Sequence, residues 1–334
     1  MPFQQNVTIL LLAAFTWGVG NAITGLTAGK YNSESILIPP LLIAIANTLG
    51  GLVFLGLTLG VLVARRRRDE PPIRTTLAGI ARQRWAALGA GASKGLNTGF
   101  YVLSATHASA TVSLVLESTY VVWTALFAAV TMRTKEGTKW VVRAVLLVTA
   151  AALVAGYSNS PGGGKSLLGN VGGLIAALSY ATFVSMWARV TKDLKRFEEK
   201  LVATGALLTF SLLTLLCITV CAIVFASPSD KKIFDAISAA DFSLQLLNGM
   251  LVVGVVYLLV TIGLASISSR ADSSVLGSGI LTLSIPFTLL TETVAGRVSP
   301  TVLQLLGVGL FMAAFVWISR PNASRRTERR TGDS

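Results

Sequence analysis

The stretch Leu201–Ala226, LVATGALLTFSLLTLLCITVCAIVFA, contains no charged side chain over 26 residues. An α-helix rises about 1.5 Å per residue, so about 20 apolar residues cross the hydrocarbon core of a bilayer. Lipid offers no hydrogen bonds to an exposed backbone, and a helix satisfies its own backbone groups. This stretch therefore predicts a membrane-spanning helix.

Comparable apolar stretches recur along the whole chain of 334 residues, which is 53% hydrophobic and only 13% charged. Soluble proteins carry about 25% charged residues. The alternating ten-residue segments of a membrane β-barrel are absent. We therefore expect an all-α membrane protein with ten transmembrane helices, at about Val7–Ala28, Ile36–Ala64, Trp85–Ala105, Ala110–Thr131, Trp140–Tyr157, Leu168–Val190, Leu201–Ala226, Leu244–Ile267, Ser273–Ala295 and Pro300–Ser319.

The basic residues predict how this bundle is oriented. If the N-terminus is inside, the cytoplasmic segments hold 22 of the 28 Lys and Arg residues and the outer segments hold five, with Lys94 inside a span. Cytoplasmic loops of membrane proteins are enriched in Lys and Arg. We therefore expect a multi-pass protein of the plasma membrane, rather than an internal membrane, with both termini in the cytoplasm.

The same distribution explains the net charge of +13 without a nucleic-acid partner, because the excess lies in loops beside the membrane. The run Arg65–Arg68 is interpreted first as a topology signal and second as a contact for anionic lipid. His107 is the only histidine, and Cys217 and Cys221 lie without further ligands nearby. No metal-binding or nucleophile motif is present, so we expect neither an enzyme nor a metal or cofactor.

The two halves of the chain repeat each other weakly. A shift of 161 positions places Leu103–Ala105 on Leu264–Ser266, and a shift of 163 places Ala13–Gly18 on Ala176–Ala181. Because five spans is an odd number, the second half must enter the membrane inverted, as in many secondary transporters. We therefore divide the chain into a first five-helix repeat (1–160), a second, inverted repeat (161–320) and a basic, disordered cytoplasmic tail (321–334).

These segments resemble the drug/metabolite transporter superfamily, specifically its EamA-like branch of ten-helix proteins. The similarity rests on Ala13–Gly18, on Leu168–Asn170 leading into Leu174–Ala181, and on the turn Leu103–Ala110. It implies a central cavity lined mainly by spans 1, 3, 4, 6, 8 and 9. The Gly-Glu pair that the family commonly shows after spans 4 and 9 is altered here to Lys135-Glu136 and Gly296-Arg297.

Two ionisable residues lie at membrane depth, Lys94 in the third expected span and Glu117 in the fourth. A charge there costs several kcal/mol unless it is paired or hydrated. The two spans are antiparallel, so the side chains are expected within reach of each other. Either a fixed ion pair joins the two spans, or the charges bind substrate or a proton, and both roles are compatible.

Polar and aromatic residues at helical spacing extend this candidate site. The expected substrate-binding residues are Lys94, Glu117, Asn97, Tyr101, Tyr120, Trp17, Asn21, Tyr180, Tyr257, Ser278 and Thr282. Glu292 is interpreted separately: it is either an outer gate residue or a carboxylate close enough to the outer interface to reach water, and we favour the second interpretation.

We expect a secondary transporter that moves a small polar or amphipathic organic solute, such as an amino acid-like metabolite or drug, by alternating access. Its partners would be this solute, the lipid bilayer and a coupling proton or counter-substrate. An organic anion, nucleotide sugar or sugar phosphate is the alternative substrate, drawn by Lys94. A non-transporting receptor or scaffold is the alternative of another class.

The charge distribution generates a test of topology. Single cysteines introduced in the segment Arg65–Arg84 and in the tail 321–334 should react only with reagents that reach the cytoplasmic face. The ten expected spans place an even number of spans between these segments, so both should lie on one face of the membrane. Labelling of the two segments from opposite faces would contradict this count.

Overall fold

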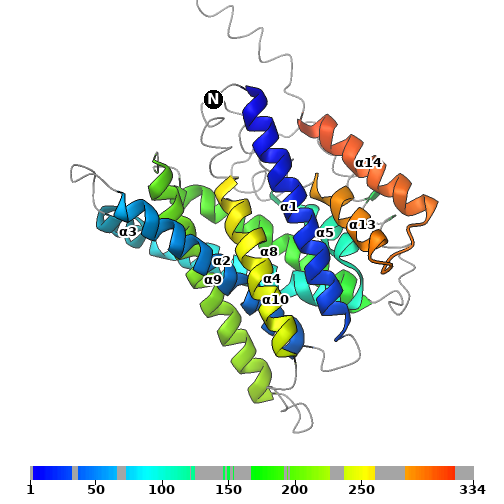
Figure 1. The fold of residues 1–334 in the computed structure, drawn as a ribbon, viewed down its shortest axis with the longest axis horizontal. Helices are drawn as coiled ribbons and strands as arrows, with labels where there is room; N and C mark the ends of the chain where they lie inside the picture. The colour runs from blue at the N-terminus through cyan, green and yellow to red at the C-terminus, as the bar shows by residue number, and fades with distance from the viewer. Residues whose placement is uncertain are drawn as a thin grey trace, which may run out of the picture.

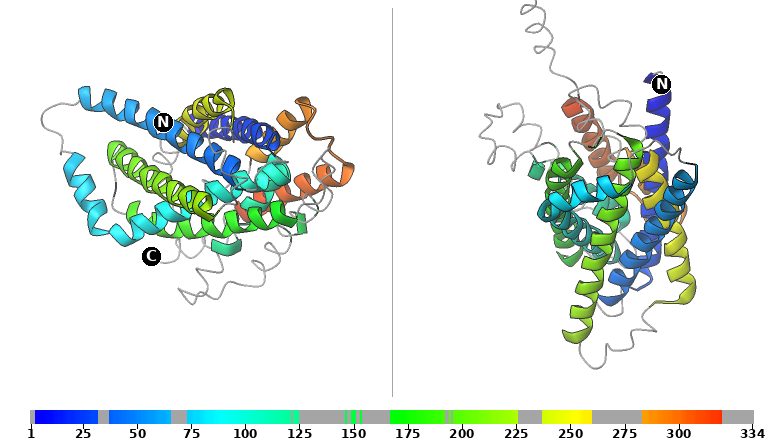
Figure 2. Two further views of the ribbon diagram at one scale, coloured as in Figure 1. Left: turned by 90° about the horizontal axis from the view of Figure 1, so that it is seen from below. Right: turned by 90° about the vertical axis from the view of Figure 1, so that its left-hand side faces the viewer.

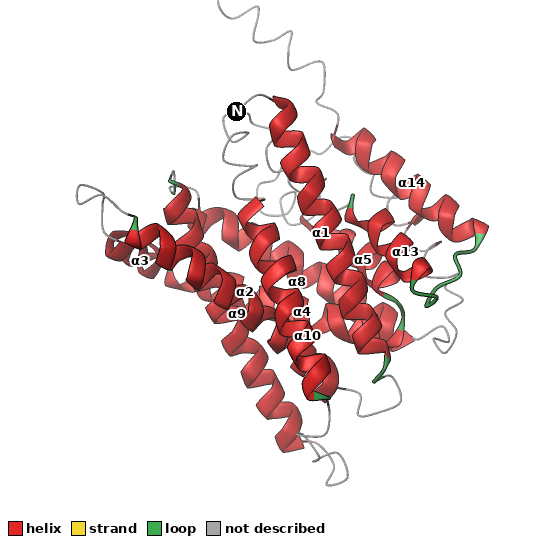
Figure 3. Ribbon diagram, in the orientation of Figure 1, coloured by secondary structure: helices red, strands yellow, loops and turns green. Residues whose placement is uncertain are grey.

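The computed structural model describes most of the chain, and within the described residues every regular element is a helix (Figure 3). The described residues are 3–31, 37–65, 73–120, 122–124, 146, 149–150, 153, 167–191, 194, 196–225, 237–259 and 283–319. Figure 1 shows the helices packed into one bundle, with α3 at one side and α13 and α14 at the other. The helices are α1 (Phe3–Gly29), α2 (Ile38–Ala64), α3 (Ile73–Arg82), α4 (Arg84–His107), α5 (Ala110–Ser118), α8 (Leu167–Thr191), α9 (Phe197–Phe225), α10 (Ala239–Gly249), the π-helix η3 (Met250–Val255), α13 (Ser284–Val294) and α14 (Val302–Ser319).

Five of the described helical segments are long and apolar enough to cross a membrane. This supports the membrane class that the composition predicted. The helix α4 is long enough, with 24 residues, but it carries too many polar residues to qualify by composition. It packs against α1, α2, α8 and α9, so neighbouring helices surround much of it. The five segments are Leu11–Gly29, Ile38–Ala64, Leu167–Thr191, Phe197–Phe225 and Ala239–Leu259.

Several expected spans are confirmed as helices to within a few residues, including those matched by α2, α8 and α9. The expected span at Trp140–Tyr157 and the repeat segment Leu264–Ala271 lie almost entirely outside the described residues, as does the tail. The ten-span inverted repeat therefore stays a prediction.

The helix α3 was not predicted, because ten residues are too few to cross a bilayer. Its apolar residues Ile73, Leu77 and Ile80 follow the spacing of one helical face. Ile80 is buried in a cluster with Ala87 of α4 and Val190 of α8. This periodicity was the signal available in the sequence.

The helices α2 and α10 approach each other so closely that glycine is required at the contact. A β-carbon on Gly249 would collide with the backbone carbonyl oxygen of Asn47, and one on Gly50 would collide with that of Leu246. Figure 2 shows the same bundle from two further sides. Backbones that approach this closely bring their short polar side chains within hydrogen-bond distance.

Glu292 of α13 is fully buried, so the expectation that it reaches water was wrong. Its carboxylate accepts hydrogen bonds from the backbone amides of Ala110 and Thr111, each at 2.9 Å, and from the Thr111 hydroxyl at 2.7 Å. Ser109 accepts a further bond from the amide of Val112 at 3.2 Å. The unpaired amides and positive dipole end of α5 are therefore capped by a carboxylate from the other half of the chain.

Arg297, in the turn after α13, lies near the contact between Glu292 and α5 and joins further helix ends to it. Its Nη2 donates to the backbone oxygen of Ala105 at 3.1 Å, and its guanidinium lies directly against Gly29. Burial lowers the pKa of Arg297 from its ordinary value, and the charge of Glu292 opposes that shift. The C-terminal ends of α1 and α4 consequently meet at this turn.

Replacing Glu292 with glutamine tests the helix cap. One acceptor oxygen would be lost and an amide group would face the donors of α5, so Glu292→Gln should lower the free energy of unfolding by about 2–3 kcal/mol. Glu198→Gln, in the first turn of α9, is the matched control and should change it by less than about 0.5 kcal/mol. Equal thermal stability of the two variants in detergent would contradict the cap.

Candidate functional site

A cavity of about 60 Å³ lies inside the bundle, between α1, α2, α4, α5, α9, α10 and η3. This volume accommodates a few water molecules. The π-helical turn η3 contributes Val252 and Val253 to its wall, and such turns are frequent at functional sites. Seven of the residues predicted for the site line this cavity: Trp17, Asn21, Lys94, Asn97, Tyr101, Glu117 and Tyr257.

Lys94 and Glu117 are joined through Asn97 and not by a direct ion pair. The Lys94 Nζ donates to Asn97 Oδ1 at 2.8 Å, and Asn97 Nδ2 donates to Glu117 Oε1 at 2.6 Å. The remaining hydrogen of Asn97 Nδ2 reaches the backbone oxygen of Ala176 at 3.1 Å. Lys94 and Glu117 are 6% and 8% exposed, so both charged groups are effectively removed from solvent. The amide bridge orients its oxygen toward the cation and its nitrogen toward the carboxylate.

Aromatic rings surround the Lys94 ammonium. Its Nζ lies 5.2 Å from the ring centre of Tyr180 and 5.9 Å from those of Trp17 and Phe183. Cation–π contacts of this kind strengthen when the cation is desolvated. The face of each ring therefore compensates part of the hydration that Lys94 loses.

The remaining predicted residues fall into two groups. Tyr120 packs edge-on against Tyr180, with ring centres 4.6 Å apart, and both belong to a buried cluster beside the cavity. Tyr180 thus contacts Lys94 from the side, although neither tyrosine lines the cavity itself. Ser278 and Thr282 lie outside the described residues.

Sequence reasoning missed a wall of short polar side chains on α1, α2 and α10. Asn248 Nδ2 donates to the Thr24 hydroxyl at 3.0 Å and to the Gly20 carbonyl at 3.1 Å. Asn47 Nδ2 also donates to Thr24, at 3.2 Å. The available signal was an asparagine within an otherwise apolar span, at Asn47 and again at Asn248. Thr48 and Thr98 line the cavity as well.

The polar wall continues toward the end of the bundle where α1 meets α10. Gln245 Nε2 donates to the Thr27 hydroxyl at 2.7 Å. Beyond it, Asp241 accepts from Lys30 Nζ and from the Tyr31 hydroxyl, both at 2.7 Å. This is the end that the charge distribution predicts to face outward, and these contacts hold α1 against α10 there.

No family model matches the chain, and no curated protein matches it. Among 21 solved chains that match, one is described only as the crystal structure of a protein. It superposes with a TM-score of 0.51, is 20% identical, and the match covers 92% of this chain and 96% of the other. At this identity the similarity shows a shared fold and does not identify a function.

A double-mutant cycle tests the bridge. Lys94→Met and Glu117→Gln should each lower the free energy of unfolding by about 3–5 kcal/mol, because each leaves a buried charge uncompensated. The double variant should lose less than the sum of the two, and Asn97→Leu should reduce this coupling. Lys30→Met, which removes a side chain 59% exposed, is the matched control and should cost about 1 kcal/mol or less. Strictly additive losses would show that Lys94 and Glu117 do not interact.

Proposed function

We propose that the chain is a secondary transporter that moves a small polar or amphipathic organic solute across a membrane by alternating access. The observation that carries this proposal is the bridge Lys94–Asn97–Glu117, buried beside a cavity in a bundle of apolar helices. Charged residues at membrane depth are expensive and usually mark a substrate or ion pathway. An amino acid-like solute suits a cavity with one cationic and one anionic side chain.

The ten-span arrangement of two inverted repeats belongs to this proposal, as do the EamA-like family and a plasma-membrane location. Inverted halves can exchange conformations, which turns a cavity from one face of the membrane to the other. In the conformation described here, contacts between α1 and α10 and between α5 and α13 hold the expected outer end together. Outward opening would require at least one of these contacts to separate.

A reversible cross-link tests alternating access. Lys30→Cys and Asp241→Cys would be combined in a background in which the exposed Cys217 and Cys221 are replaced by serine. A bifunctional thiol reagent should then abolish flux of labelled amino acids, organic acids or sugar phosphates into proteoliposomes, and a reducing agent should restore it. The two single-cysteine variants, treated identically, should keep their flux.

Two results would overturn the proposal. The first is solute flux that the cross-link leaves unchanged. The second is saturable binding of these solutes without flux, which is the behaviour of a membrane receptor with the same fold.

A further inference from the structure

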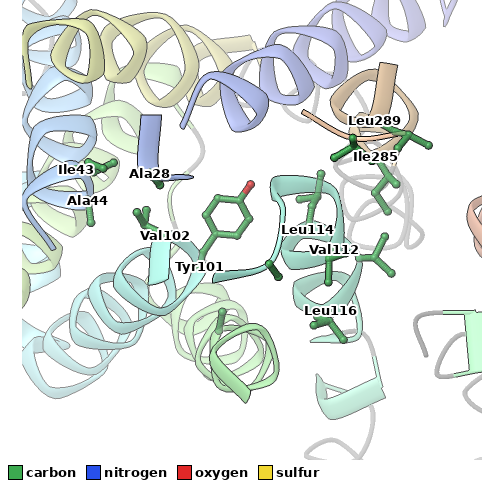
Figure 4. Close-up of a cluster of buried hydrophobic side chains, with 14 of the residues drawn as sticks. Ala28, Ile43, Ala44, Tyr101, Val102, Val112, Leu114, Leu116, Ile285 and Leu289 are labelled. Atoms are coloured by element: carbon green, nitrogen blue, oxygen red, sulfur yellow. The ribbon is translucent and has the colours of Figure 1, made fainter. Parts of the chain in front are cut away.

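Two buried polar groups in the cavity wall have no protein partner within the described part of the chain: Nδ2 of Asn21 on α1 and the hydroxyl of Tyr101 on α4. Each residue is only 7% exposed. Figure 4 shows the Tyr101 ring among buried apolar side chains, including Ala28 and Leu114, with its hydroxyl pointing away from α4. Buried polar groups are nearly always hydrogen-bonded, so two such groups without a partner at one cavity need an explanation.

The neighbouring polar groups show that the shortage of partners is local. Nδ2 of Asn97 has two acceptors, and Nδ2 of Asn248 also has more than one. The hydroxyl of Thr98, which lines the same cavity, donates to the backbone oxygen of Lys94 at 3.0 Å. Packing in this region therefore satisfies polar groups efficiently, and Asn21 and Tyr101 depart from that pattern.

The two unpaired groups lie toward the same end of the cavity. The C-terminal ends of α1 and α4 both contact Arg297, so the two helices run toward the same end of the bundle. Trp17 of α1 lies beside Lys94 of α4. Asn21 follows Trp17 by one turn, about 6 Å of helix rise, and Tyr101 follows Lys94 by two turns, about 10 Å. Both groups are thus displaced from Lys94 toward the expected outer end.

The chemistry of these groups defines what they can bind. An asparagine Nδ2 is a donor only, and a tyrosine hydroxyl donates to an anion. Asn97 engages both charged side chains of the cavity, the Lys94 ammonium and the Glu117 carboxylate, so these two charges balance each other. Two unpaired donors at one cavity form a site for an oxyanion, because hydrogen bonds to an ionised acceptor are the strong ones.

We propose that Asn21 and Tyr101 bind the carboxylate of the small solute that the cavity accepts. This inference rests on the proposed function only in taking the cavity as the solute site. It makes the two residues determinants of specificity: small solutes with a carboxylate bind, and small amines without one do not.

The test compares three probes on the purified full-length protein: alanine, propionate, which lacks the amine of alanine, and ethylamine, which lacks its carboxylate. Binding is measured as the ligand-dependent rise in melting temperature. Alanine and propionate should bind at least ten-fold more tightly than ethylamine. Tyr101→Phe and Asn21→Leu should each weaken propionate binding at least ten-fold, and Asn21→Asp should weaken it further through charge repulsion.

A matched pair of tyrosine variants separates binding from folding. The Tyr101 hydroxyl has no hydrogen-bond partner to lose in the described part of the chain, so Tyr101→Phe without ligand should melt at or above the temperature of the unmodified protein. The Tyr31 hydroxyl donates to Asp241 at 2.7 Å and accepts from the amide of Ser238 at 3.1 Å. Tyr31→Phe should therefore lower the melting temperature.

The carboxylate site is overturned if Tyr101→Phe binds propionate as tightly as the unmodified protein. It is equally overturned if ethylamine binds as well as propionate, or if neither alanine nor propionate binds, in which case water is the only partner of these groups. The proposed transport can fail separately. If carboxylates bind in a way that depends on Tyr101 but no flux is seen in proteoliposomes, only the transport proposal is contradicted. If a solute without a carboxylate is transported, and Tyr101→Phe leaves that flux unchanged, only the carboxylate site is contradicted.

Discussion

The organisation of the site depends on one constraint, the presence of a lysine ammonium in the interior of an apolar bundle. Lys94 is 6% exposed, and the free-energy cost of burying an unpaired ammonium far exceeds the stabilisation that one helix–helix contact provides. The surrounding residues meet this cost together: Asn97 accepts its hydrogen bond, Glu117 balances its charge through that amide, and three aromatic rings face it. The relative positions of α1, α4, α5 and α8 follow from these contacts, because each helix contributes at least one of the groups.

A second polar system joins α1, α2 and α10 and follows from the close approach of their backbones. Gly50 and Gly249 allow the backbones of α2 and α10 to approach closely, which brings Asn47 and Asn248 within hydrogen-bond distance of the Thr24 hydroxyl. These side chains satisfy one another and extend from the cavity toward Lys30 and Asp241. The cavity therefore has one wall that is charged and aromatic and one wall of neutral amides and hydroxyls.

Much of this arrangement was predictable because composition and periodicity act locally. An uncharged stretch such as Leu201–Ala226 has to form a helix in lipid wherever it lies in the bundle, and Lys94, Asn97 and Tyr101 share a helical face by spacing alone. The pairing of Lys94 with Glu117 was predictable only in part. Helix register placed them within reach, but the amide of Asn97 occupies the space between them, and rotamers of neighbouring helices decide such a contact. Glu292 was misjudged for the same reason, because its donors lie 181 and 182 residues away on α5.

By itself the sequence determined which segments are apolar enough to cross a membrane, their helical structure and the identity of the charged residues within the expected spans, since each depends on hydrophobicity and spacing along one segment. Only the tertiary structure decided which polar groups find partners. Asn21 and Asn47 are the same residue type in similar apolar helices, yet Asn47 meets Thr24 whereas Nδ2 of Asn21 faces the cavity without a partner in the described chain. Hydrogen bonding depends on distances of a few tenths of an ångström between helices remote in sequence, and packing sets those distances.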